Sequence, residues 1–222
     1  MIESTQNGVA ENSMFKYNDN QIISTDNSKE EVRYTYNDEL ITTIINYNKK
    51  TKTTVTLDYS YIEGKLVKVT SSEKYEIDYA YNSDGSVSYQ KYVVNSQNQK
   101  QKDYHGTLSF KNDNLIKDER FFDQKNQDLV ASSKISYTYD THNNPYASII
   151  GFDKLLDHGA AISKNNNLMT VAESQIVEGD QTTSSANMYT TTYKYDSDNY
   201  PTEQVSEASA TNPNYSKIQY LY

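Results

Sequence analysis

The stretch KISYTYDTHNNPYASI, residues 134–149, contains the pattern that decides the fold. Ile135, Tyr137 and Tyr139 alternate with polar residues, and this period of two predicts a β-strand with one aromatic face and one polar face. Residues 140–145 then supply the Asp, Asn and Pro that favour a turn. The same order of strand, turn and returning strand recurs along the chain, so we expect an all-β protein built of repeated hairpins.

The other copies of this hairpin unit also place aromatic residues before a turn rich in Asn and Asp. Their aromatic rows include Phe15, Tyr34, Tyr59, Tyr79, Phe110 and Tyr193. One turn, Asn82–Gly85, contains Asp-Gly, which is a strong hairpin signal. Successive turns lie roughly 20 to 30 residues apart, a spacing typical of repeat architectures. We predict an antiparallel meander of roughly 13 to 16 strands in sequence order, curled into an open barrel or half-barrel.

The composition indicates a folded chain with a thin core. The 222 residues include 22 Tyr, carry a formal net charge of −9 and have a mean hydropathy of −0.88. Tyr, Thr, Val and Ile suit a pleated, half-buried surface, and Tyr buries its ring while its hydroxyl reaches water. We therefore expect Tyr to be the main core residue. The acidic balance disfavours a nucleic-acid partner and electrostatic docking on anionic lipid.

The domain organisation is expected to be simple. Residues 14–222 form one all-β repeat domain, residues 1–13 form a disordered leader, and a helix-containing insertion lies at about 151–186. The leader lacks the basic and apolar regions of a signal peptide. Either a signal or lipoprotein segment is removed from the native protein, or the protein is cytosolic with a ragged end.

One short helix is predicted over Gly151–His158, because Phe152, Leu155 and Leu156 have the spacing of one helix face. Gly159 suits the C-cap of this helix. The helix would lie on the sheet or plug one end of it. Residues 168–177 are expected to form a strand, and residues 178–186 a loose loop.

The sequence contains no signature of a cofactor site or a metal site. With no Cys there is no disulfide and no thiolate ligand, and His105, His142 and His158 do not have metal-ligand spacing. The turns Asn82–Gly85 and Asp196–Asn199 resemble the start of a calcium loop, but they lack its later bidentate Glu. Ordinary turn chemistry explains both, so we expect no metal and no cofactor.

Catalytic chemistry is not predicted either. Asp153, Asp157 and His158 could share a helix surface and perform acid–base work. Solvated helix ends have the same composition, and they are the favoured interpretation. No nucleophile elbow or phosphate-binding loop is present, so the chain is expected not to be an enzyme.

Two units, YTYDTHNNPY (137–146) and YKYDSDNYPT (193–202), resemble the Tyr-Asp repeat of the Rhs and YD-repeat superfamily. With the segment GFDKLL (151–156) and the Asn triplet at 165–167, they are similar to uncharacterised secreted lipoproteins of Bacteroidota. Repeat lengths are irregular, and the Gly that usually follows the Tyr-Asp pair is mostly missing. The resemblance implies an exported β protein of the periplasm or outer cell surface, attached to a membrane only through an N-terminal lipid anchor outside this chain.

Three functions are compatible with these features. The first is a non-enzymatic envelope protein with a binding or scaffold role toward a protein partner or a glycan. Its candidate binding surface comprises Tyr137, Tyr139, Tyr193, Tyr195, Phe152 and Leu155. The absence of Trp disfavours the glycan. The second is a periplasmic carrier that holds an apolar ligand in a half-barrel cup, with the helix as lid.

The third is a carboxylate-dependent hydrolase, which needs two carboxylates at inward strand positions. The carboxylates are found mainly at turns. A cavity above about 300 Å³ would favour the carrier, and a flat exposed Tyr patch would favour the binding protein. We expect a monomer, or a dimer formed by pairing of the first and last strand edges.

Overall fold

The structure is a computed structural model, and it describes residues 1–6, 9–123, 129–208 and 215–222. The described residues form sixteen antiparallel strands in one meander, and the strand order follows the sequence order as predicted. The sheet closes into a barrel, because β1 (Ile2–Gln6) pairs with β16 (Tyr215–Tyr220) as well as with β2 (Val9–Asn18). The prediction of an open or half-barrel is thereby corrected.

Closure depends on residues that the sequence analysis placed in a disordered leader. The range 1–13 contains all of β1 and the start of β2, so the structure corrects that expectation. Because the first and last strands pair with each other, neither leaves a free edge among the described residues. The predicted dimer, in which the first and last strand edges pair between molecules, therefore lacks the free strand edges that it requires.

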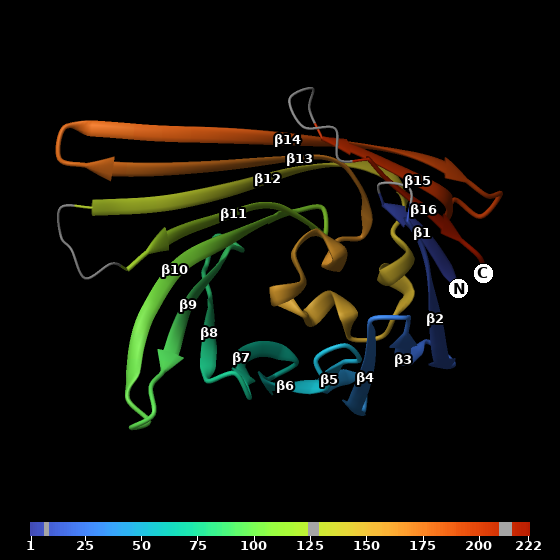
Figure 1. Cartoon of the computed structure of the whole chain (residues 1–222), viewed down its shortest axis with the longest axis horizontal. Coiled ribbons are helices and arrows are strands. Elements are labelled where there is room, and N and C mark those ends of the chain that lie inside the picture. The colour runs from blue at the N-terminus through green and yellow to red at the C-terminus, as the bar shows by residue number, and fades with distance from the viewer. Residues whose placement is uncertain (7–8, 124–128, 209–214) are drawn as a thin grey trace.

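The remaining strands differ in length around the barrel. They are β3 (Gln21–Asp26), β4 (Glu30–Asn37), β5 (Leu40–Asn48), β6 (Thr53–Ile62), β7 (Lys65–Ser71), β8 (Tyr75–Tyr81), β9 (Val87–Val94), β10 (Lys100–Lys111), β11 (Asn114–Phe122), β12 (Leu129–Asn143), β13 (Asn165–Glu178), β14 (Gln181–Tyr195) and β15 (Pro201–Ala208). In Figure 1 the long strands β12 to β14 extend well beyond the helical segment that fills the lumen.

A recurring bulge explains why the hairpin units share one aromatic position. Just before several turns the register shifts, so that the last aromatic residue of one strand faces a buried aliphatic residue at the second position of the next strand. The pairs are Tyr17 with Ile22, Tyr36 with Ile41, Tyr61 with Leu66 and Phe110 with Leu115. All four aliphatic partners are at most 1% exposed, so these turns gather a band of core residues at one end of the barrel.

Tyrosine hydroxyls tie neighbouring units together within this band. The Tyr61 hydroxyl donates to the carbonyl of Ile41 at 2.8 Å, and Tyr139 donates to the carbonyl of Leu115 at 2.5 Å. The amide of Ile22 donates to the Tyr36 hydroxyl at 3.2 Å. Each ring is thus held at both its apolar body and its polar tip, which is the role that Tyr suits.

The connection between β12 and β13 folds into the lumen as a plug (Figure 1). It contains three 3-10 segments, η1 (Pro145–Ser148), η2 (Phe152–Lys154) and η3 (Leu156–Ile162). The plug is fixed to the turns at the band end, where the Ile150 amide donates to the Asn20 carbonyl at 2.9 Å. Gly151 is required there, because its φ is +75° and a Cβ would lie 2.5 Å from the Glu39 carbonyl oxygen.

The plug departs from the predicted helix in two ways. The helix over Gly151–His158 is replaced by short 3-10 pieces, and Gly159 lies inside η3 at a kink with φ 56° rather than at a C-cap. The rest of the predicted insertion is sheet, since β13 and the start of β14 occupy most of residues 165–186. None of the helices in the described ranges has the length and apolar character that crossing a membrane requires.

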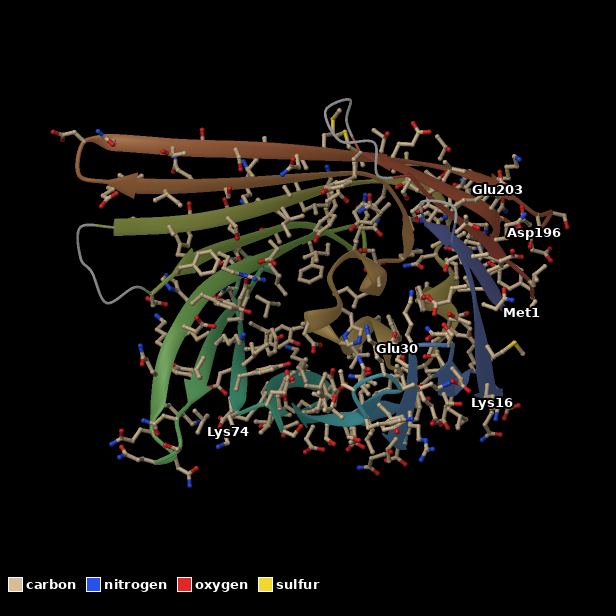
Figure 2. All side chains as sticks on the ribbon, in the orientation of Figure 1. Met1, Lys16, Glu30, Lys74, Asp196 and Glu203 are labelled. Carbon is tan, nitrogen blue, oxygen red and sulfur yellow. The ribbon has the colours of Figure 1, made fainter. Side chains whose placement is uncertain are left out.

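The inner and outer faces of the wall differ in chemistry. Inward positions carry the buried core, which is mostly aliphatic with Tyr59, Tyr79 and Tyr89, so Tyr is a core residue but not the main one. Outward positions carry ion pairs spread around the barrel. Among them are Arg33–Glu31, Lys68–Glu76, Lys134–Glu173, Lys194–Glu203 and Lys217–Glu203. Figure 2 shows Lys16 and Glu203 on the outside of the wall.

Candidate functional site

A cavity of about 500 Å³ lies in the lumen, between η3 and the wall formed by β6 to β12. We call it the lumen cavity. Five tyrosine rings dominate its lining, and five charged or titratable side chains lie among them. The rings are Tyr75, Tyr79, Tyr89, Tyr104 and Tyr137, and the other groups are Lys91, Asp118, Arg120, Asp157 and His158. The strands supply these groups at inward positions, while the plug supplies Asp157 and His158.

Arg120, Asp118 and Tyr89 form one cluster on the cavity wall. Asp118 accepts the Tyr89 hydroxyl at 2.5 Å and lies 3.3 Å from the Arg120 guanidinium. The guanidinium also lies over the Tyr104 ring, 4.3 Å from its centroid. Burial and the Asp118 carboxylate raise the pKa of Tyr89, so this hydroxyl is a neutral donor at physiological pH.

Gly106 makes room for this cluster. It lies on β10 opposite both Tyr89 and Arg120 in the strand register. A Cβ at this position would lie 2.4 Å from the Tyr89 hydroxyl oxygen and 2.3 Å from the Glu119 carbonyl oxygen. A larger residue would therefore displace the ring that Asp118 and Arg120 hold.

Asp157 organises a second cluster on the plug side of the cavity. It accepts the Tyr59 hydroxyl at 3.1 Å, and its other carboxylate oxygen lies 3.1 Å from Nδ1 of His158. Burial, with the nearby Asp157 carboxylate, raises the pKa of Tyr59 and of Tyr79. The carboxylate thus favours neutral hydroxyls on the rings that face it.

The remaining cation, Lys91, is also partnered. Its ammonium lies 4.7 Å from the centroid of the Tyr75 ring and 5.2 Å from that of Tyr104. It lies 3.5 Å from the Asp103 carboxylate as well. Lys91, Asp118 and Arg120 therefore each have an opposite charge or a ring face beside them, and Asp157 has a tyrosine hydroxyl and an imidazole.

Several hydroxyls in the lumen cavity are left for a ligand. The hydrogen bonds between described residues do not use the hydroxyls of Tyr79, Tyr104 or Tyr137. Burial raises the pKa of Tyr137 to about 12, so its hydroxyl stays protonated. A neutral hydroxyl is both donor and acceptor, and the cavity can therefore bind hydroxyl groups from several directions.

The predicted binding residues do not lie together on one surface. Tyr137 lines the lumen cavity, whereas Tyr139, Tyr193 and Tyr195 point inward at the band end and bond to Leu115, Asn167 and Asp140 respectively. Phe152 and Leu155 are 4% and 0% exposed in the core of the plug. The structure corrects the expectation that these six residues form a shared binding face.

The other candidate residues have ordinary roles. Asp153 pairs with Lys154 and His105 lies beside Asp123, both away from the lumen cavity. In the acidic turns, Asp84 accepts the Ser86 amide, and Asp196 accepts the amides of Asp198 and Tyr200. Across the described part of the chain, no cluster of three or more His, Cys, Asp or Glu side chains could hold a metal.

Sequence reasoning found Asp157 and His158 but missed Lys91, Asp118 and Arg120. Charged residues in an alternating strand are ordinarily assigned to the solvent face. The available signal was parity, because Asp118 and Arg120 fall in step with the inward residues of the neighbouring strands β10 and β12. Without the strand register, the sequence does not tell which of the two faces of β11 points inward.

No model of a known protein family matches the sequence, and a comparison with characterised proteins gives no match. Among solved structures, this chain is similar to a porin-like protein from Bacteroides uniformis, with a TM-score of 0.52. The match covers 99% of this chain and 95% of that one at 10% sequence identity. The two chains therefore share a fold, which supports an all-β architecture.

Proposed function

We propose that this chain is a non-enzymatic binding protein of the cell envelope, and that it takes a neutral, hydroxyl-rich ring, such as a sugar unit of a glycan, into the lumen cavity. The chemistry of the lining carries this proposal. Tyr79, Tyr104 and Tyr137 offer hydroxyls to a ligand beside ring faces on which a sugar ring can stack. Since the charged side chains are already partnered, an ionic ligand would have to displace existing pairs.

The chemistry of the outer wall supports the proposal that the outside of the barrel is in contact with water. Transmembrane barrels have an apolar outward band and a polar interior. This barrel carries ion pairs such as Lys134–Glu173 on its outside, and much of its interior is a buried apolar core. We place it in the periplasm or on the outer cell surface, in keeping with the porin-like Bacteroides protein that shares its fold. The YD-repeat and lipoprotein resemblances have no further support.

The two alternative functions fit the lumen cavity less well. Its size exceeds the threshold that favoured a carrier, but charged groups and hydroxyls line it, so an apolar ligand would leave polar groups unpaired. For a hydrolase, Asp118 and Asp157 do lie in one cavity. Each of them, however, already accepts a tyrosine hydroxyl and has a cation or His beside it. This arrangement favours positioning a ligand over cleaving it.

The experiment is saturation-transfer NMR with neutral disaccharides such as cellobiose, maltose and lactose, followed by calorimetric titration. We expect at least one of them to bind the native chain. Tyr79→Phe, which removes one cavity hydroxyl and keeps the ring, should weaken binding about fivefold, the value of one hydrogen bond. The matched control is Tyr92→Phe, because the Tyr92 hydroxyl bonds to Gln90 on the outer wall.

Three results would contradict the proposal. The first is the absence of any saturation transfer from the protein to these sugars. The second is an equal loss of affinity in Tyr79→Phe and Tyr92→Phe. The third is release of free monosaccharide during incubation, which would make the protein a hydrolase.

A further inference from the structure

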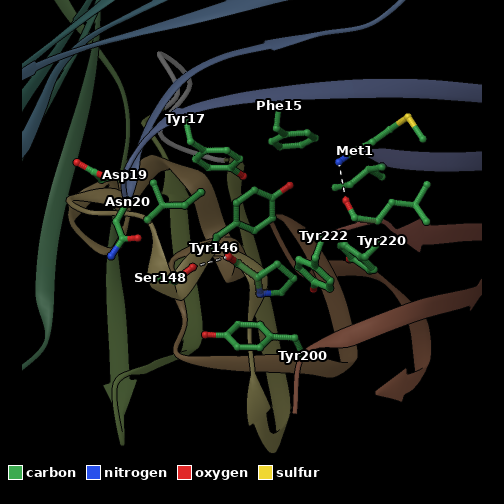
Figure 3. A pocket seen from close by; sticks show the side chains of 14 residues that line it. Met1, Phe15, Tyr17, Asp19, Asn20, Tyr146, Ser148, Tyr200, Tyr220 and Tyr222 are labelled. Atoms are coloured by element: carbon green, nitrogen blue, oxygen red, sulfur yellow. Dashed lines mark hydrogen bonds between the residues drawn. The ribbon is translucent and has the colours of Figure 1, made fainter. Parts of the chain in front are cut away.

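A second cleft, of about 370 Å³, lies where the barrel closes (Figure 3). We call it the seam cleft. Its sides come from the strands next to the closure, β2 and β16, and its floor comes from η1 of the plug. It shares no lining residue with the lumen cavity. It is therefore a separate site with its own chemistry.

Aromatic rings form both sides of the seam cleft. On β2, Phe15 and Tyr17 are stacked, with centroids 6.4 Å apart and an angle of 13° between planes. On the opposite side, Tyr220 and Tyr222 are stacked at 6.3 Å and 9°. Figure 3 shows the Tyr146 ring between these two pairs. A flat molecule could therefore contact ring faces on either side.

The seam cleft is almost without charge. Of the described side chains that line it, only Asp19 ionises near neutral pH, and the Met1 ammonium at the cleft donates to the Leu221 carbonyl at 2.8 Å. Burial raises the pKa of Tyr17 and of Tyr146, so both hydroxyls remain neutral. Neither hydroxyl takes part in a hydrogen bond between described residues. The site therefore combines apolar ring faces with two uncharged donors.

The rim of the seam cleft is open to solvent. Tyr17 is 51% exposed and Tyr222 is 74% exposed. Large aromatic side chains left exposed around a cleft are typical of ligand sites rather than of structural cores. Both can also be changed with less effect on the fold than a buried ring.

We propose that the seam cleft is a second binding site, specific for planar, uncharged aromatic molecules that carry a hydrogen-bond acceptor. Such a ligand lies against the exposed Tyr17 and Tyr222 rings and accepts a hydrogen bond from the Tyr146 hydroxyl. A charged ligand gains little here, because Asp19 is the lining side chain that ionises and the Met1 ammonium already donates to the Leu221 carbonyl. This inference does not depend on the function proposed for the lumen cavity.

The test is fluorescence titration with Prodan, an uncharged naphthyl ketone whose carbonyl can accept a hydrogen bond and whose emission brightens and shifts to the blue in apolar sites. The native chain should bind one molecule with micromolar affinity. Tyr222→Ala should weaken binding at least fivefold, and Tyr222→Phe should restore it because the ring is kept. Tyr79→Phe in the lumen cavity and Tyr92→Ala on the outer wall should leave probe binding unchanged. Circular dichroism of each variant checks that the barrel remains folded.

Several results would overturn this inference. One is the absence of saturable binding by the native chain. A second is unchanged affinity in both Tyr222→Ala and Tyr17→Ala. A third is weaker probe binding in Tyr79→Phe, which would place the probe in the lumen cavity. Disaccharide binding by Tyr222→Ala is measured in parallel, so that failure at one site is distinguished from failure at the other.

Discussion

The barrel has a dry wall and a wet wall. The dry wall, β3 to β11, carries all the buried aliphatic and aromatic strand residues among the described residues, from Ile22 to Leu115, and Pro201 on β15 is the buried apolar strand residue outside it. The wet wall, β12 to β16, has polar or half-buried inward positions such as Ser174 and Thr191, whose hydroxyls bond across strands to Ser185 and Ser206. Both walls alternate with the same period, so they differ only in which side chains point inward.

The plug accounts for this difference. Its buried residues, including Phe152 and Leu155, join the same core cluster as the inward residues of the dry wall. The dry wall thereby packs its apolar side chains against the plug and is polar only around the lumen cavity, while the inward positions of the wet wall are mostly polar or half-buried. A barrel can thus gain most of its stability from one side and leave the other side available for polar contacts.

Alkali gives the largest expected effect, because it acts on both walls at once. Burial raises the pKa of inward tyrosines on each side, among them Tyr59 and Tyr79 on the dry wall and Tyr193 on the wet wall. Their contribution to stability is complete below the unfolded pKa of about 10 and is lost as pH rises toward the folded value. We expect unfolding above pH 10.

Tyrosinate absorbance at 295 nm, recorded with circular dichroism, measures this transition cleanly because the chain has no Trp. One cooperative rise coincident with loss of sheet signal is expected. Gradual ionisation of most tyrosines in a folded barrel would show that the rings are not buried as described.

An Ile→Ala substitution on each wall should distinguish the two walls by the loss in the free energy of unfolding. Ile44 on β5 is 2% exposed, whereas Ile218 on β16 is half-buried. Ile44→Ala should lower the free energy of unfolding by about 3 kcal/mol and Ile218→Ala by about 1 kcal/mol, because only the first leaves a closed cavity. Urea denaturation measures both. Equal losses would remove the distinction between the walls.

A smaller contrast is expected from tyrosine hydroxyls. Tyr61 donates to the carbonyl of Ile41, a residue with 0% exposure, and Tyr193 donates to the carbonyl of the half-buried Asn167. Tyr61→Phe should cost about 1.5 kcal/mol and Tyr193→Phe about 0.5 kcal/mol, since water can replace the second bond more easily. Thermal unfolding of the two variants checks the order, and the reverse order would contradict the wet-wall description.

Much of the sheet could be predicted from the sequence. Alternation around residues such as Tyr137 and Tyr139, with Asn-rich and Asp-rich turns, was enough for the strands and their sequential order. Closure was not predictable, because β1 (IESTQ) has too few apolar residues to look like a strand and is held by pairing on both sides. Tertiary contacts override weak local propensity in such segments.

The lumen cavity could be predicted only in part. The plug residue Asp157 was recognised as a candidate because it lies one helical turn after Asp153 and could share a helix surface with it and His158. Arg120 and Asp118 were not, because their inward orientation follows from register with β10 and β12. The 3-10 conformation of the plug could not be predicted from the sequence either, because the spacing of Phe152 and Leu155 fits an α-helix equally well.

NMR of the chain labelled with ¹³C on its tyrosine rings, titrated with the disaccharide that binds best, tests the central claim most directly. That claim is that the lumen cavity binds a hydroxyl-rich ring. The predicted result is that the signals of Tyr79, Tyr104 and Tyr137 shift together and saturate. The signals of Tyr92 and of Tyr47, which lies opposite the outward Glu31 in the strand register, should not move. Shifts confined to Tyr47 and Tyr92 would place the sugar on the outer wall and contradict the proposal.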